Sequence, residues 1–185
     1  MLIVVETGSP KGFRFIHSVR ERFVKKPREE ACIVAPCPHH LACPKACVSK
    51  TWCHFSQLVP KYPKRVIVKA PRESAMDNEK FCYLILKKGK TPNVLLKDES
   101  KTVTLSEKSF FWPRAILPSI IKQKHVIIDL CATSGLIERR IIGKSSGEEG
   151  GYYWARKLHW GDLWEFPPII PNRFRKEKRR SRRMW

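Results

Sequence analysis

The chain has 185 residues, and its 37 lysines and arginines against 17 aspartates and glutamates give a formal net charge of +20. This charge excludes an acidic or near-neutral enzyme surface. It is also more than one pocket for a small anion can use, so it indicates a polyanionic partner, nucleic acid rather than membrane. Apolar residues make up 42% of the chain, which is enough for the core of one domain. No apolar run approaches the roughly 20 residues that span a bilayer.

Residues 1–35 predict a strand, a helix and a second strand. Residues 2–5 form a short apolar run before a Gly-Ser-Pro turn, which indicates a buried strand. From residue 11 to residue 26, apolar side chains recur at steps of three and four until Pro27, as in an amphipathic helix. Residues 31–35 form a second apolar run. We therefore expect the βαβ portion of a parallel sheet here.

Residues 36–60 break every periodicity with four prolines, three histidines and four cysteines, so we interpret them as a cysteine-rich loop that binds a cluster. Residues 61–166 then supply the later strands. Within them, residues 65–69, 81–86 and 125–131 predict strands, and residues 135–142 predict a turn and a return strand. We expect an exposed irregular connection over 89–108 and a helix that turns into a Trp-Gly-Asp bend over 152–164.

Residues 167–185 form a basic tail. Eight of its side chains are cationic and only Glu177 is acidic. We expect this tail to be disordered until it meets RNA, because such a charge run cannot form a core. Its cations would then neutralise phosphates without reading bases. The predicted RNA-binding residues are Arg173, Arg175, Lys176, Lys178, Arg179, Arg180, Arg182 and Arg183.

The chain contains seven cysteines, an odd number, and four of them crowd between Cys37 and Cys53. This favours metal or cluster ligation over disulfides. Thiolates suit zinc or an iron–sulfur cluster, and both normally take four ligands. The loop could provide all four, or Cys131 at the end of its predicted strand could provide one, and spacing alone does not choose. Cys32 and Cys82 lie in strand-like runs and are interpreted as packed thiols. The candidate zinc ligands besides cysteine are His39, His40 and His54.

Several motifs occur together and in a characteristic order. They are Val5-Glu6-x-Gly8-x3-Gly12-Phe13, Ala35-Pro-Cys-Pro-His39, Cys43-Pro44, Trp52-Cys-His-Phe-Ser-Gln57, Glu79-Lys-Phe81 with Tyr83-Leu84, Asp129-Leu-Cys131, and Ala155-Arg-Lys157 with Trp160-Gly-Asp162. From residue 2 to about residue 165, the chain resembles the C-terminal half of the methyltransferase-like mitochondrial small-ribosomal-subunit assembly proteins, the methyltransferase-like protein 17 type.

The resemblance implies an α/β chain that forms the C-terminal half of a Rossmann-like methyltransferase fold. It also implies a cysteine-held [4Fe–4S] cluster and work in the mitochondrial matrix on the maturing small subunit and its rRNA. Carried over by position, the cluster ligands are Cys37, Cys43, Cys53 and Cys131, and Cys47 is an extra thiol.

The chain departs from this family pattern in one large respect, because Met1 falls where the later strands of the methyltransferase sheet begin. The glycine-rich turn that binds S-adenosylmethionine is absent from these residues, so autonomous methyl transfer is not expected. We therefore predict a non-catalytic rRNA-binding component or assembly factor of the mitochondrial small ribosomal subunit, in contact with mitochondrial ribosomal proteins. The alternatives are one half of a split methyltransferase, with a separate chain as the N-terminal half, and a zinc-binding nucleic-acid-binding protein.

Overall fold

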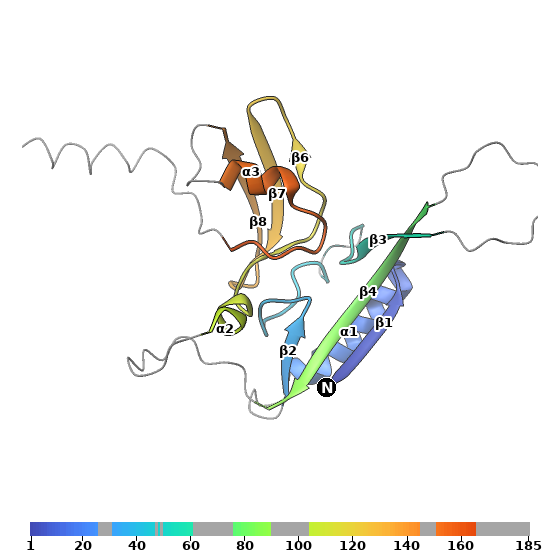
Figure 1. Ribbon diagram of the computed structural model, residues 1–185. Helices are drawn as coiled ribbons and strands as arrows, with labels where there is room; N and C mark the ends of the chain where they lie inside the picture. Colours follow the sequence, from blue (N-terminus) through green and yellow to red (C-terminus); the bar gives the residue numbers. More distant parts are fainter. Residues whose placement is uncertain are drawn as a thin grey trace, which may run out of the picture.

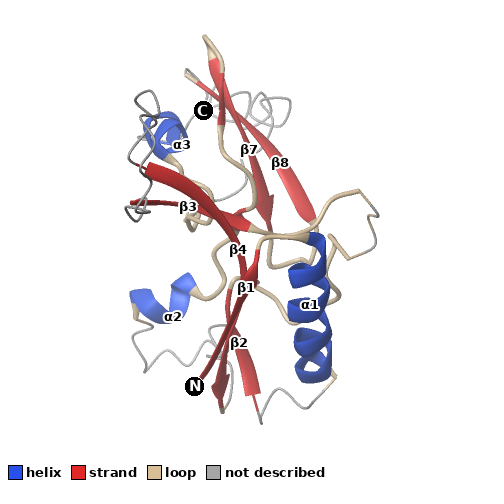
Figure 2. Ribbon diagram, turned by 90° about the vertical axis from the view of Figure 1, so that its right-hand side faces the viewer, coloured by secondary structure: helices blue, strands red, loops and turns tan. Residues whose placement is uncertain are grey.

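The computed structural model describes residues 1–25, 31–46, 48, 50–60, 76–89, 104–144 and 151–165. Within them, two four-stranded sheets lie one beyond the other with the cysteine-rich loop between them (Figures 1 and 2). The strand predicted at residues 65–69, the thiol of Cys47 and the basic tail lie outside the described residues. None of the described helices is long and apolar enough to cross a bilayer.

The first sheet is built around β4 (Met76–Lys88), which contains the strand predicted at residues 81–86. β1 (Leu2–Thr7) pairs with one edge of β4, and β2 (Ala31–Ala35) and β3 (Phe55–Pro60) pair with the other, all antiparallel. Thr7 and Phe55 both pair with Phe81, so their strands lie on opposite edges of β4. β2 and β3 therefore follow one another along a single edge, and the cysteine-rich loop leaves the sheet between them.

Two expectations about this sheet are wrong. β1 and β2 do run in the same direction with a helix between them, but they do not pair with each other as in a parallel βαβ unit. β4 lies between them, and each strand pairs antiparallel with β4. The local pattern could not predict this, because β4 lies far along the chain. The cysteine-rich segment is also shorter than predicted, because its last six residues form β3.

β1 is an exposed strand and not the buried one expected from its apolar run. The exposed fractions of Leu2, Ile3 and Val5 are 47%, 53% and 60%, whereas Val4 packs toward the helix side of the sheet. The cause is position, since α1 (Pro10–Val24) covers one face of the sheet and no described strand pairs with the outer edge of β1. The sheet therefore presents an apolar edge.

α1 confirms the predicted amphipathic helix. The Ser9 side chain caps it by accepting a hydrogen bond from the Gly12 amide at 3.1 Å. Ile16 faces Ile33, Leu84 and Leu86 in one apolar cluster, which fixes the helix on the sheet.

Gly8 and Gly12 allow the helix to begin close to two strands. A Cβ atom on Gly12 would lie 2.1 Å from the Thr7 carbonyl oxygen, and one on Gly8 would lie 2.5 Å from the Lys80 Cβ. Both distances are well inside van der Waals contact, so these positions require glycine for packing.

Gly12→Ala is therefore expected to lower the free energy of unfolding by about 1–3 kcal/mol, the usual cost of overpacking. Alanine elsewhere in a helix stabilises relative to glycine, so the sign of the change reports the clash. Denaturant unfolding measures it, with Arg14→Ala on the exposed side of the same helix as the control. An unchanged or raised stability in Gly12→Ala would contradict the close approach.

The second sheet is built around β7 (His125–Cys131) and confirms the strand predicted there. β8 (Ile137–Gly143), the predicted return strand, pairs with one edge, and β5 (Arg114–Ala115) and β6 (Ile120–Ile121) pair with the other. α3 (Gly151–Lys157) leads into the predicted Trp-Gly-Asp bend, where Gly161 has φ +100°. The short helix α2 (Leu105–Ser109) lies in the segment expected to be irregular. The core of the second sheet is Ala115, Val126, Ile128, Leu130, Ile142, Ala155 and Trp164.

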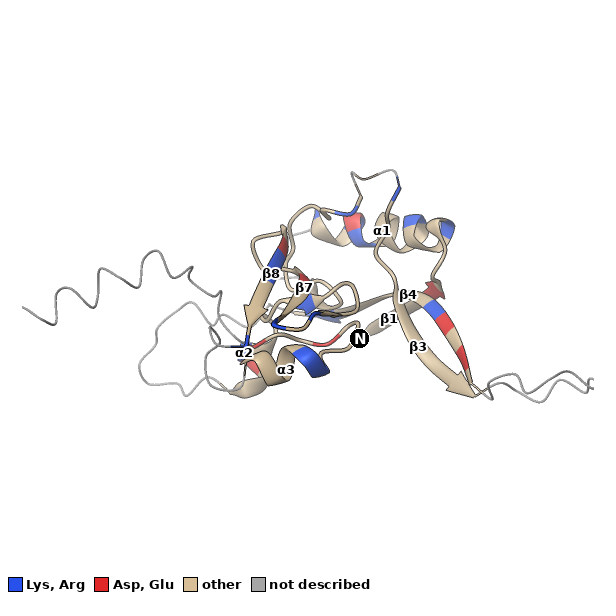
Figure 3. Ribbon diagram, turned by 90° about the horizontal axis from the view of Figure 1, so that it is seen from above, with Lys and Arg blue, Asp and Glu red and all other residues tan. Residues whose placement is uncertain are grey.

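The described body carries part of the basic charge. Lysines and arginines lie along α1 and at the end of α3 (Figure 3). On the second sheet the arginines are paired instead. Arg139 makes a bidentate contact with Asp129 at 2.7 and 2.9 Å, and Arg140 contacts Glu138 at 2.7 Å. The arginines of β8 therefore face acidic partners on the second sheet.

Candidate metal centre

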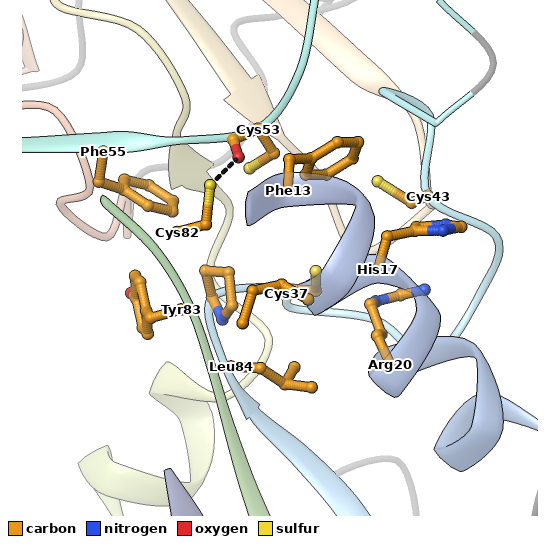
Figure 4. A pocket seen from close by; sticks show the side chains of 12 residues that line it. Phe13, His17, Arg20, Cys37, Cys43, Cys53, Phe55, Cys82, Tyr83 and Leu84 are labelled. Atoms are coloured by element: carbon orange, nitrogen blue, oxygen red, sulfur yellow. Dashed lines mark hydrogen bonds between the residues drawn. The ribbon is translucent and has the colours of Figure 1, made fainter. Parts of the chain in front are cut away.

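The cysteine-rich loop begins where β2 ends and returns to the sheet at β3, so its two ends are fixed along β4. Cys37, Cys43 and Cys53 of the loop line a cavity of about 30 Å³ together with residues of α1 and β4 (Figure 4). Cys82 of β4 lines it too, and its thiol donates to the Cys53 carbonyl oxygen at 3.2 Å. Three of the four proposed ligands therefore face one cavity.

Cys131 reaches the same region from the second sheet. It is the last residue of β7, and its Sγ lies 3.4 Å from Nε2 of His39 in the loop. The charge states of Cys37 and Cys43 both influence the pKa of Cys131, as expected for neighbouring thiols. The structure thus brings together Cys37, Cys43, Cys53 and Cys131, although residue 131 is far from the loop in sequence.

Burial controls the acidity of these thiols. It raises the pKa of Cys131 to about 12, and it raises the pKa of Cys53 well above the ordinary thiol value, with further increases from its neighbouring cysteines. Burial also raises the pKa of Cys37. Without a metal, Cys37, Cys53 and Cys131 are therefore protonated at neutral pH. A bound metal would reverse this, because coordinating thiols are deprotonated.

Two arginines place positive charge beside the thiols. Arg20 of α1 is only 3% exposed and donates to the carbonyl oxygens of Leu41 at 2.7 Å and His39 at 3.3 Å. Arg114 of β5 donates to the carbonyl oxygens of Pro36 at 2.7 Å and Gly161 at 2.6 Å. Both guanidinium groups lower the pKa of Cys37 and of Cys131, against the effect of burial. The site can therefore stabilise negative charge on sulfur.

The sequence analysis did not identify Arg20 or Arg114 as parts of the site. The signal for Arg20 is its position one helical turn after Ile16, on the face of α1 that packs against the sheet. A charged residue there needs partners, and it finds them in the loop. For Arg114 no local signal exists, since β5 is two residues long.

Aromatic contacts also join the loop to the second sheet. The His54 ring stacks on Trp52 with centroids 5.3 Å apart, and it meets the edge of Trp160 at 4.8 Å. Trp52 Nε1 donates to the Gly8 carbonyl oxygen at 2.9 Å. Residues of the Cys-His-Phe-Ser and Trp-Gly-Asp motifs therefore lie together.

The donors gathered at the site are mainly thiols. Among the described residues, no three side chains of histidine, cysteine, aspartate or glutamate lie close enough to hold a single ion. A zinc ion would need four donors within about 2.3 Å of one point. Of the candidate zinc ligands, His40 Nε2 instead accepts from the Ile33 amide at 3.2 Å, and His54 takes part in the aromatic stack. Three thiols line the cavity and Cys131 lies near Cys37 and Cys43, so the donors are of the type that an iron–sulfur cluster takes, and Arg20 and Arg114 lie close enough to act on their charge.

Comparison with known proteins defines the class of the chain. Residues 1–165 match the model of a family described as "Mitochondrial small ribosomal subunit Rsm22". The chain belongs to this Rsm22 family, which confirms the resemblance found in its motifs.

Three relatives illustrate the similarity. The chain is 31% identical to Rsm22-cox11 tandem protein 2, mitochondrial, of Schizosaccharomyces pombe, over 89% of the chain and 24% of the relative. It is 27% identical to ribosome assembly protein METTL17, mitochondrial, of Homo sapiens, over 94% of the chain and 34% of the relative. It is 24% identical to ribosome assembly protein RSM22, mitochondrial, of Saccharomyces cerevisiae, over 71% and 28%. The chain spans about a quarter to a third of the length of these relatives.

Proposed function

We propose that the chain is a non-catalytic, rRNA-binding component or assembly factor of the mitochondrial small ribosomal subunit, working in the matrix and stabilised by a [4Fe–4S] cluster. Two relatives are named ribosome assembly proteins and three are named mitochondrial, which supports the place of action. The observation that carries the proposal is that three loop thiols line one cavity and that Cys131 reaches the same loop, with its Sγ 3.4 Å from Nε2 of His39. Iron and sulfide analysis of anaerobically purified protein tests it.

The proposed ligands are Cys37, Cys43, Cys53 and Cys131. When bound, the cluster would supply a structural cross-link between the loop and the end of β7. Arg20 and Arg114 would offset the negative charge of the cluster and its thiolates, and the carbonyl contacts of both arginines would hold the loop in position. No methyl transfer is assigned to these residues, and Gly8 and Gly12 of the β1–α1 turn serve close packing.

RNA is the proposed partner because the net charge is +20, and the basic tail supplies eight cations. In the described body, a groove of about 680 Å³ beside α3 is lined by Trp112, Trp154, Lys157 and His159. The indole of Trp154 is exposed, so an unpaired base could stack on it. Asp162 and Glu165 also line the groove, so its aromatic side chains and not its net charge suit a nucleotide. We propose that the tail binds phosphates and the groove binds a base.

The apolar edge of β1 supports a further partner, a strand that pairs with this edge. An uncovered apolar edge invites pairing with other strands. We therefore expect the chain expressed alone to be poorly soluble.

We expect the double variant Ile3→Lys with Val5→Lys to raise the soluble fraction several-fold. Both side chains are exposed and lie on the opposite face from Val4, so the substitutions leave the packing between the sheet and α1 unchanged.

Soluble yield and light scattering measure this effect, and Leu105→Lys, also exposed but outside both sheets, is the control. A wild-type chain that is a soluble monomer with a cooperative melt would show that the edge needs no partner.

A further inference from the structure

The imidazole of His39 is buried in the cysteine-rich loop, with 5% of the residue exposed. Its Nδ1 lies 3.1 Å from the Leu41 amide nitrogen and accepts a hydrogen bond from that N–H. The Nδ1 atom therefore carries no proton. In a neutral imidazole the proton then lies on Nε2, so the backbone of the loop itself fixes the tautomer.

The Nε2 atom that carries the proton points toward the second sheet. It lies 3.4 Å from Sγ of Cys131, within the range of a hydrogen bond to sulfur. The His39 carbonyl oxygen accepts a hydrogen bond from Arg20 at 3.3 Å, so the residue is held at its backbone as well as at its ring. A rigid, buried N–H donor aimed at a sulfur atom is the arrangement by which neighbouring residues orient and tune a metal ligand.

We infer that His39 is a positioning residue that donates a hydrogen bond from Nε2 to the Cys131 sulfur when that sulfur ligates the cluster. The inference rests on the proposed function for the cluster, and it adds a role for a residue that is not a ligand. The donated hydrogen bond withdraws electron density from the sulfur and stabilises the thiolate. It thereby raises the reduction potential of the cluster and slows the loss of iron.

Two amide substitutions separate the donor from the acceptor. His39→Gln places an amide nitrogen near the position of Nε2, so it keeps a donor to Cys131 and loses the acceptor for the Leu41 amide. His39→Asn places its oxygen near the position of Nδ1, so it keeps that acceptor and loses the donor. If His39 mattered only through its contact with the Leu41 amide, the asparagine variant would behave more like wild type. The inferred role predicts instead that the glutamine variant behaves more like wild type.

The experiment measures iron release to a chelator and the midpoint potential of the anaerobically purified full chain. We expect His39→Asn to lose iron about tenfold faster than wild type, the low end for a residue that orients a metal ligand. We also expect it to have a more negative potential, and His39→Gln to lie close to wild type in both. His125→Asn, at the opposite end of β7, is the matched control. If His39→Asn behaves as wild type, or if the glutamine variant is the worse of the two, the inference is wrong.

A second readout does not need the cluster. The nitrogen NMR spectrum of the imidazole in the metal-free, reduced chain is expected to show the tautomer protonated at Nε2. A proton at Nδ1 would overturn the inference. Failure of the proposed function is distinct, since it appears as a wild-type chain without iron and sulfide.

Discussion

Cys131→Ser is expected to leave the anaerobically purified chain with most of its iron and acid-labile sulfide lost, whereas the wild-type chain is brown and contains the two in equal amounts. Cys131 is the single proposed ligand on the second sheet, so its loss removes the cross-link that the cluster would make between that sheet and the loop. Cross-linking across a closure of about 100 residues is worth roughly 4–5 kcal/mol in chain entropy. We therefore expect a fall in unfolding free energy of that order together with the loss of colour.

The matched comparison is between two thiols of the loop. Cys53→Ser is expected to lose the cluster and Cys47→Ser to keep it, because the family pattern leaves Cys47 outside the ligand set. The opposite result would show that the ligand set is wrong. One tightly held zinc and no sulfide in the wild-type chain would instead support a zinc-binding nucleic-acid-binding protein.

Deletion of residues 173–185 is expected to remove most of the salt dependence of RNA binding. If six to eight of the tail cations contact phosphates, the slope of log affinity against log salt is about −4 to −6, using roughly −0.7 per phosphate for single strands. The deletion is expected to flatten this slope and to weaken binding to all RNAs alike. Affinity measured across a salt series, with wild type alongside, gives both quantities.

An unchanged slope after the deletion would place the phosphate contacts on the folded body. The basic candidates there are Arg139, Arg140, Arg156 and Lys157, and the first two already contact acidic partners. The affinity that remains in the deletion variant is expected to fall on Trp154→Ala, with little change in slope, because stacking on an indole involves no counterion release.

Local patterns in the sequence predicted the elements that depend on local chemistry. The spacing of apolar residues in α1 and the apolar run of β7 each indicate their own structure. Pairing is different, because the place of β4 between β1 and β2 depends on which distant strand fits, and no window of the sequence contains both partners. The exposure of Val5 has the same cause, since an apolar run has the same sequence pattern at the edge of a sheet as in its middle.

Some residues of the candidate site could also be predicted from local sequence, whereas others depend on the fold. Residue types predicted a cluster of thiols in the loop, and the family resemblance added Cys131, which spacing alone left open. Arg114 was not predicted because its position depends on β5 pairing with the end of β7. The tautomer of His39 likewise depends on a backbone amide two residues away and becomes visible only in three dimensions.

The course of the chain along β4 has a consequence for how this family can vary. Ala35 pairs opposite Ile85 and Phe55 pairs opposite Phe81, so the chain leaves the edge and rejoins it with residues 82–84 between. Residues inserted into the loop lengthen an excursion whose two ends stay fixed, and each doubling of loop length costs only about 0.6 kcal/mol. Evolution can therefore change the number of residues between Cys43 and Cys53 without shifting the register of a single strand, so homologous ligands are better aligned by the strands that flank them than by their spacing.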